Sequence, residues 1–116
     1  MQLRALKYLE DINLSCDYIN EFSKGKNYLD YKKDYQLKFS IERLLITIGE
    51  AVNKLSKNCD IHLKSESAMV ALRNIMVHEY ESVHDNLIWQ IINTQLIDLK
   101  IEVEQIIKDN EHNIER

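Results

Sequence analysis

The 116-residue sequence has no proline and only two glycines, Gly25 and Gly49. Proline and glycine punctuate the turns of all-β folds, so their scarcity argues against a strand-rich fold and favours helices. Cysteine is also scarce. Cys16 and Cys59 lie far apart, without a CxxC or Cys/His cluster, which suits reduced and buried thiols in a cytosol better than a disulfide scaffold.

Long apolar runs are missing as well. No run approaches the roughly 18 residues needed to span a bilayer, and the opening Met1-Gln2-Leu3-Arg4 lacks the apolar stretch of a signal peptide. We therefore expect a cytoplasmic protein without a membrane segment. Acidic and basic residues along the whole chain give a net charge of −4, which argues against a generally polyanion-coating surface. Any contact with a polyanion has to be local.

Apolar residues recur every three or four positions in four stretches, the spacing of amphipathic helices. Each apolar stripe must be buried against another helix. The sequence therefore predicts an all-α fold, a four- to five-helix bundle that forms one domain over residues 1–116. The expected elements are a helix from about the start to Ser23, a polar loop to Asp34, a helix from about Asp34 to Lys57, a short helix that begins at Ser65-Glu66-Ser67, a helix with Asp85 as its N-cap and a stripe to Ile106, and a frayed tail from Asp109.

Gly49 lies inside the second predicted helix. A glycine within a helix costs about 1 kcal/mol relative to alanine, so its presence indicates that another backbone or a ligand approaches closely there. The alternative is a glycine that is merely tolerated at a helix crossing.

The segment from Arg73 to Tyr80 concentrates reactive groups, namely Arg73, Asn74, His78, Glu79 and Tyr80. Arginine presents a charged, planar fork of donors that suits phosphate oxygens, and histidine titrates near neutrality and moves protons. Together they suit phosphodiester cleavage. The plainer interpretation is a surface arginine and a capping histidine near a helix end.

The spacing of Arg73 and His78 has a geometric consequence. Residues five apart on a regular helix point roughly 140° away from each other. The two side chains converge on one phosphate only if the helix ends or bends between them, or if two subunits face each other across a symmetric interface. Break signals after Tyr80 favour the first possibility.

The string Arg73-Asn74-Ile75-Met76-Val77-His78-Glu79-Tyr80 resembles the Arg-x4-His-x-Tyr motif of the HEPN superfamily, specifically the HepT-like toxins. Ile48-Gly49-Glu50-Ala51 resembles the Ile-Gly-Glu-Ala of the family's preceding long helix, and Asp85 with Trp89 resembles the residues that open its last helix. One departure is Ile61-His62-Leu63-Lys64, which stands where many relatives carry a Pro-Trp pair. It concerns the conformation of a loop more than the chemistry.

This resemblance implies a homodimeric helical bundle in which the motifs of both subunits line one cleft. Arg73 would bind the scissile phosphate, and His78 would move the proton of the 2′-hydroxyl or of the leaving group. Asn74 would orient the phosphate or His78, unless it is only a helix-surface residue. Glu50 would hold Arg73 in place, unless its role is structural.

The resemblance also implies a place in a type VII-like toxin–antitoxin system. A cognate minimal nucleotidyltransferase, the antitoxin, would transfer AMP onto Tyr80, adding charge and bulk beside the cleft; otherwise Tyr80 is a phenol packed at a helix end. The implied enzyme is an endoribonuclease acting on RNA, with transfer RNA one candidate. It needs neither metal nor cofactor, and His62, His84 and His112 show no metal-ligand spacing. Two rival interpretations remain, a non-catalytic module that binds a nucleotidyltransferase or a nucleotide, and a purely structural helical dimer.

Overall fold

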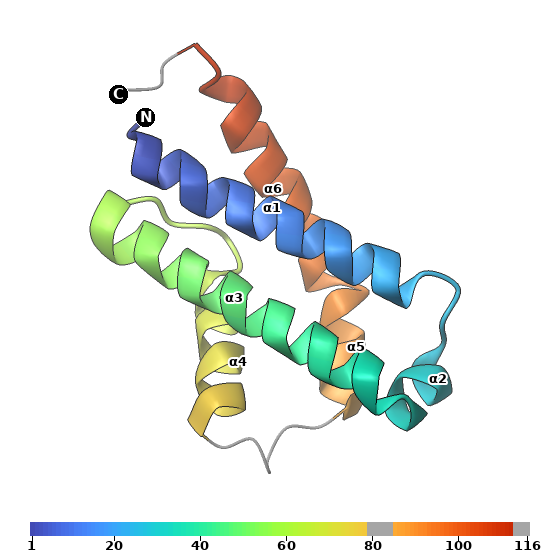
Figure 1. Ribbon diagram of the computed structural model, residues 1–116. Helices are drawn as coiled ribbons and strands as arrows, with labels where there is room; N and C mark the ends of the chain where they lie inside the picture. The colour runs from blue at the N-terminus through green and yellow to red at the C-terminus, as the bar shows by residue number, and fades with distance from the viewer. Residues whose placement is uncertain (79–84, 113–116) are drawn as a thin grey trace.

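Helices make up most of the described chain, which covers residues 1–78 and 85–112 of a computed structural model (Figure 1). Within these ranges the chain has five helices of eight or more residues and one short helix. The predicted all-α class is confirmed, and the homodimer stays a prediction. The elements are α1 (Leu3–Ser23), α2 (Tyr28–Lys33), α3 (Tyr35–Cys59), α4 (Glu66–His78), α5 (Asp85–Ile92) and α6 (Gln95–Asp109).

The two longest helices, α1 and α3, run side by side in opposite directions and form the centre of the bundle (Figure 1). Their apolar stripes face each other, and side chains such as Ile12 of α1 and Ile48 of α3 have no exposed surface. Burying one such side chain is worth about 1.5–3 kcal/mol, so the stripes hold the bundle together. Helix α4 packs on α3 and helix α6 packs on α1, which places α4 on one flank of α3.

Helix α2 lies in the stretch that the sequence predicts to be a polar loop, so that prediction is wrong for residues 28–33. A capping box begins the helix, because the Asn27 side chain accepts from the backbone N–H of Asp30 while the Asp30 carboxylate accepts from the N–H of Asn27. Tyr31 anchors it, fully buried and tilted against the Trp89 ring at 5.4 Å between centroids. One buried aromatic and a good cap are enough to order a single polar turn.

The last predicted helix is divided into α5 and α6, which corrects the expectation of one continuous helix from Asp85. The Asn93 side chain donates to the Trp89 carbonyl at 2.7 Å, and the Thr94 hydroxyl donates to the Gln90 carbonyl at 2.7 Å. Short polar side chains that bond to backbone in this way compete with the helical pattern. None of the helices in the described ranges combines the length and apolar character needed to cross a membrane.

Candidate active site

Gly49 sets the distance between α3 and α4. A Cβ atom at this position would overlap the Cβ of Arg73 and would lie 2.9 Å from the backbone oxygen of Met69. The predicted close approach of another backbone is therefore confirmed, and it occurs at a helix crossing. Because Gly49 has no side chain, α4 lies directly against α3 and Arg73 is held at the crossing.

The Arg73 guanidinium has only partial support from its neighbours. Its Nη1 donates to the Asn74 side-chain oxygen at 2.9 Å, and its Nη2 lies 3.6 Å from a carboxylate oxygen of Glu50. Its Nε is shielded from solvent and has no hydrogen-bond partner among residues 1–78 and 85–112. A buried donor without a partner costs about 1–3 kcal/mol. Because Nη2 has only the long contact with Glu50 within these ranges and the side chain is 30% exposed, the outer end of the fork retains donor capacity for an anionic oxygen.

Glu50 lies beside Arg73, as the resemblance implies, but the ion pair is long and half-exposed. Such pairs contribute about 0–1 kcal/mol to stability. Glu50 follows Gly49 in α3, so the residue that allows the close approach is adjacent to the residue that contacts the guanidinium.

His78 is the last residue of α4 and is exposed. The helix is regular from Glu66 through His78, so the expected helix end or bend between Arg73 and His78 is wrong. On this continuous helix the two side chains diverge by roughly 140°. Of the two arrangements considered, only a second subunit can now bring an Arg73 and a His78 together. Tyr80 and His84 lie outside the described residues.

Asp85 and Trp89, the other two residues on which the resemblance rests, make structural contacts. Asp85 forms an ion pair with Lys38 of α3 at 3.1 Å, and Trp89 packs against the core. Burial raises the pKa of the neighbouring Glu42 carboxyl, while the positive charge of Lys38 opposes that shift. The ion pair attaches the start of α5 to α3, so Asp85 has a structural role.

A polar network that the sequence did not suggest ties α3 to α4. His62 contacts Asp60 through Nε2 at 2.9 Å and Glu66 through Nδ1 at 3.1 Å, and the Ser56 hydroxyl donates to Glu66 at 2.9 Å. Hydrogen bonds to Asp60, and then to Glu66, raise the pKa of His62. Carboxylates at both ring nitrogens favour the imidazolium. The sequence feature that could have indicated this network is the spacing Asp-x-His-x3-Glu, which spans the connection between two helices.

The same loop is fastened to α6. The backbone N–H of Lys64 donates to both carboxylate oxygens of Glu102, at 3.1 and 3.2 Å, and Leu63 is buried. These contacts explain how Ile61-His62-Leu63-Lys64 holds an ordered connection without the Pro-Trp pair of many relatives. The departure from the family's pattern thus leaves α4 firmly placed.

The His62 network predicts a pH-dependent contribution to stability. Because the folded pKa of His62 is raised above its ordinary value of 6.5, the contribution is complete below about pH 6.5 and is lost as pH rises through the folded pKa. His62→Gln should therefore lower Tm at pH 5.5 and have a smaller effect at pH 8.5. A parallel series on His112→Gln, an exposed histidine beyond α6, controls for histidine loss alone. An equal effect of His62→Gln at both pH values would contradict the prediction.

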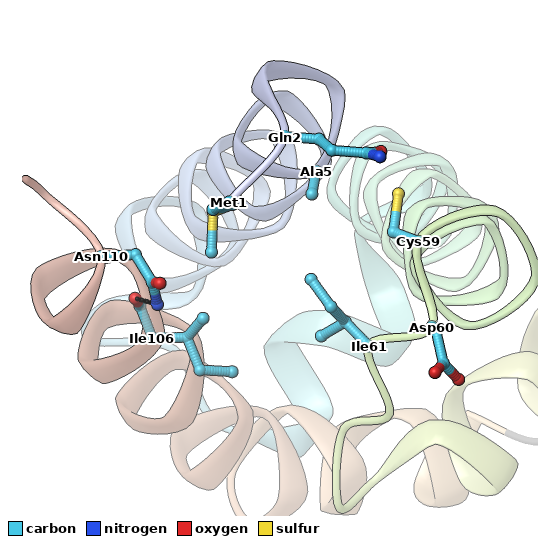
Figure 2. Close-up of a pocket in the computed structure, with 8 residues that line it drawn as sticks. All are labelled: Met1, Gln2, Ala5, Cys59, Asp60, Ile61, Ile106 and Asn110. Atoms are coloured by element: carbon cyan, nitrogen blue, oxygen red, sulfur yellow. Dashed lines mark hydrogen bonds between the residues drawn. The ribbon is translucent and has the colours of Figure 1, made fainter. Parts of the chain in front are cut away.

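A cavity of about 620 Å³ lies at the other end of the bundle, between the start of α1, the end of α3 and the end of α6 (Figure 2). Ala5, Ile61 and Ile106 provide apolar walls, and the Cys59 thiol lines the rim. Neither Arg73 nor any other residue of the predicted site lines it. Its position therefore does not support a role in the motif's chemistry.

The two cysteines differ in their surroundings. Cys16 is fully buried, and desolvation raises its pKa to about 12, so the expectation of a buried, inert thiol is confirmed there. Cys59 is only half-buried, so the same expectation is wrong for it, because the cavity opens beside the last residue of α3. Within the described ranges no three His, Cys, Asp or Glu side chains are grouped so as to hold a metal ion.

Comparisons with known proteins place the chain among ribonucleases. Residues 12–106 match the family described as Ribonuclease HepT-like. A protein of Caldanaerobacter subterraneus named "Putative RNase TTE0752" is 34% identical over 87% of this chain and 92% of its own length. "Probable ribonuclease HepT" of Thermococcus cleftensis is 29% identical over 87% of this chain and 94% of its own. No solved structure matches the chain.

Proposed function

The chain belongs to the HepT-like ribonuclease family, and from this premise we propose that it is a metal-independent endoribonuclease, the toxin of a type VII-like toxin–antitoxin pair. The observation that carries the catalytic assignment is the placement of Arg73. Its guanidinium lies at the α3–α4 crossing beside Asn74 and Glu50, its side chain is partly exposed, and Nη2 has only a 3.6 Å contact with Glu50 among the described residues. A fork of this kind suits a phosphate group, and the family's name supplies RNA as the polymer.

In this mechanism the RNA provides its own nucleophile. The 2′-oxygen attacks the adjacent phosphorus in line, the bond from phosphorus to the 5′-oxygen breaks, and the products carry a 2′,3′-cyclic phosphate and a 5′-hydroxyl. Arg73 binds the non-bridging oxygens, whose charge grows in the transition state. His78 accepts the 2′-hydroxyl proton or donates one to the leaving oxygen. Asn74 orients the Arg73 fork through the hydrogen bond between them.

A homodimer completes this site. Because Arg73 and His78 diverge on one regular helix, we place the cleft where the outer face of α4 meets the same face of a second copy. Each site then takes Arg73 from one copy and His78 from the other, so the symmetric dimer holds two such sites. Val77, which is 40% exposed on α4 between the polar residues, offers this interface an apolar contact.

Tyr80 is the proposed control point. A minimal nucleotidyltransferase partner would let the Tyr80 oxygen attack the α-phosphate of ATP, releasing pyrophosphate and leaving AMP on the phenol. The attached group brings negative charge two residues from His78, so it would oppose an incoming RNA phosphate.

The test is RNA cleavage by the purified, unmodified chain in the presence of a chelator, repeated after incubation with the nucleotidyltransferase and ATP. We expect cleavage with chelator, cyclic phosphate ends, and loss of cleavage as adenylate appears in the intact mass. Tyr80→Phe is the matched control, because it should cleave RNA and resist inactivation. Loss of cleavage in chelator that added Mg²⁺ restores would contradict metal independence. Binding of the nucleotidyltransferase without any cleavage would instead favour the binding module.

A further inference from the structure

Helix α3 carries an exposed aromatic pair that the core does not explain. Tyr35 is 67% exposed and Phe39 is 65% exposed, and their rings lie nearly parallel with centroids 6.3 Å apart. One turn further along, the exposed Arg43 has no ion-pair partner within the described part of the chain. We name this surface, Tyr35, Phe39 and Arg43, the α3 track.

The α3 track lies in the most basic part of the chain. Residues 24–43 hold six of the fifteen Lys and Arg residues but only three of the nineteen Asp and Glu residues. Lys32 and Lys33, just before α3, are exposed and form no ion pair with any described residue. Lys38 lies 5.6 Å from the centroid of the Tyr35 ring, although its charge is shared with Asp85. The segment that carries the exposed aromatics therefore has an excess of basic residues, although the chain as a whole is acidic.

The track also points toward the predicted site. Phe39 and Glu50 are eleven residues apart on α3, which corresponds to a difference in direction of roughly 20° and a rise of about 16 Å. Both therefore lie on one face of the helix. The half-buried Ile46 lies between them on that face, and Glu50 contacts Arg73. The track leads along α3 to the guanidinium over a length that suits a few nucleotides.

We propose that the α3 track binds a single-stranded stretch of the RNA substrate beside the scissile phosphate. Bases stack on the exposed faces of Tyr35 and Phe39, and Arg43, Lys32 and Lys33 contact the phosphates. Aromatic stacking accepts any unpaired base, whereas a base inside a duplex cannot reach the rings. The enzyme therefore selects RNA that presents unpaired nucleotides on this side of the cleavage point. This inference rests on the proposed function for its substrate.

An exposed aromatic pair could instead be covered by a second copy of the chain. Charge argues against it here. In a twofold-symmetric contact the same patch meets itself, so the six cations of residues 24–43 in each copy would face a patch that carries only three acidic residues. Polyanionic RNA complements these cations directly.

The experiment measures binding of a fluorescein-labelled, 2′-O-methylated single strand of about twelve nucleotides, which cannot be cleaved by 2′-oxygen attack. Fluorescence anisotropy on the full chain should show a roughly ten- to hundred-fold higher Kd for Tyr35→Ala/Phe39→Ala. Lys32→Ala/Lys33→Ala should reduce the slope of log Kd against log salt concentration by about 1.4, because each phosphate contact to a single strand contributes about 0.7. A duplex of the same length should bind with a Kd that the aromatic substitution leaves unchanged.

The chain offers a matched control in α1. Tyr18 and Phe22 form a second stacked pair at the same spacing, with centroids 6.1 Å apart, and both are about two-fifths exposed (42% and 41%). Tyr18→Ala/Phe22→Ala should leave Kd for the single strand within about two-fold of wild type, because that pair lies off the α3 track.

Four outcomes separate the possibilities. Unchanged binding by Tyr35→Ala/Phe39→Ala overturns the inference, whether or not wild type cleaves RNA. Conversion of a dimer to a monomer by the same substitution, seen by analytical ultracentrifugation, also overturns it and assigns the surface to a second copy. Weakened binding of the methylated strand at an unchanged oligomeric state supports it. A wild-type chain that binds through the track but cleaves nothing would defeat the proposed function alone.

Discussion

Replacing Arg73 or His78 with alanine is expected to lower kcat/KM for RNA cleavage by about 10²–10⁴-fold, with the folded structure retained. Arg73 loses the contact that grows with the charge of the transition state, and His78 loses proton transfer. Both effects should fall mainly on kcat, because the contacts are made most strongly in the transition state. Steady-state kinetics on one RNA, with circular dichroism to check folding, measures this.

Two further variants serve as controls, one for the loss of a positive charge and one for the shape of the Arg73 side chain. Lys7→Ala removes a cation whose side chain is 75% exposed on α1 and should cleave like wild type. Arg73→Lys keeps the charge but loses the planar fork, so it should recover only part of the activity. Wild-type rates for Arg73→Ala or His78→Ala would remove the catalytic assignment.

Mixing the two inactive variants tests the geometry of α4. If each site takes Arg73 from one copy and His78 from the other, a mixed dimer of Arg73→Ala and His78→Ala subunits contains one intact site. Random exchange should then restore about a quarter of wild-type activity. Sites formed within one chain would give no recovery. The regular helix from Glu66 to His78 is the reason to expect recovery.

The long helices could be predicted from the sequence because their apolar stripes are local. The first predicted helix ends at Ser23, as α1 does, and the second covers nearly the same residues as α3. Helix α2 depends on burial of Tyr31 against Trp89, a contact between distant segments. The break between α5 and α6 leaves the spacing of the apolar residues intact, so periodicity could not reveal it.

The candidate site could be predicted only in part from the sequence. The resemblance indicated Arg73 and Glu50, and the glycine indicated a close approach, but their meeting depends on how α4 crosses α3. The direction of His78 relative to Arg73 follows from helical geometry once α4 is known to be continuous. The His62 network was missed because its members come from two helix ends and a loop.

The α3–α4 crossing makes Gly49→Ala the most informative structural substitution. Helix propensity alone predicts a gain of about 1 kcal/mol. The added Cβ, however, would overlap the Cβ of Arg73 and lie 2.9 Å from the backbone oxygen of Met69, which cannot rotate away. Overpacking of this kind costs about 1–3 kcal/mol or more, so we expect a net loss of stability and a Tm lower by several degrees.

The same substitution should impair catalysis more than its effect on stability explains, because α4 must move away from α3 and carries Arg73 with it. A displacement of about 1 Å in a catalytic group can cost about 10²-fold in rate. Denaturant unfolding and kcat, measured well below the Tm of the variant, separate the two effects. Asn53→Ala, one turn further along α3, is the control for propensity; it should raise stability by about 0.5 kcal/mol and leave kcat nearly unchanged. If Gly49→Ala stabilised the protein and cleaved RNA normally, the crossing would not be what positions Arg73.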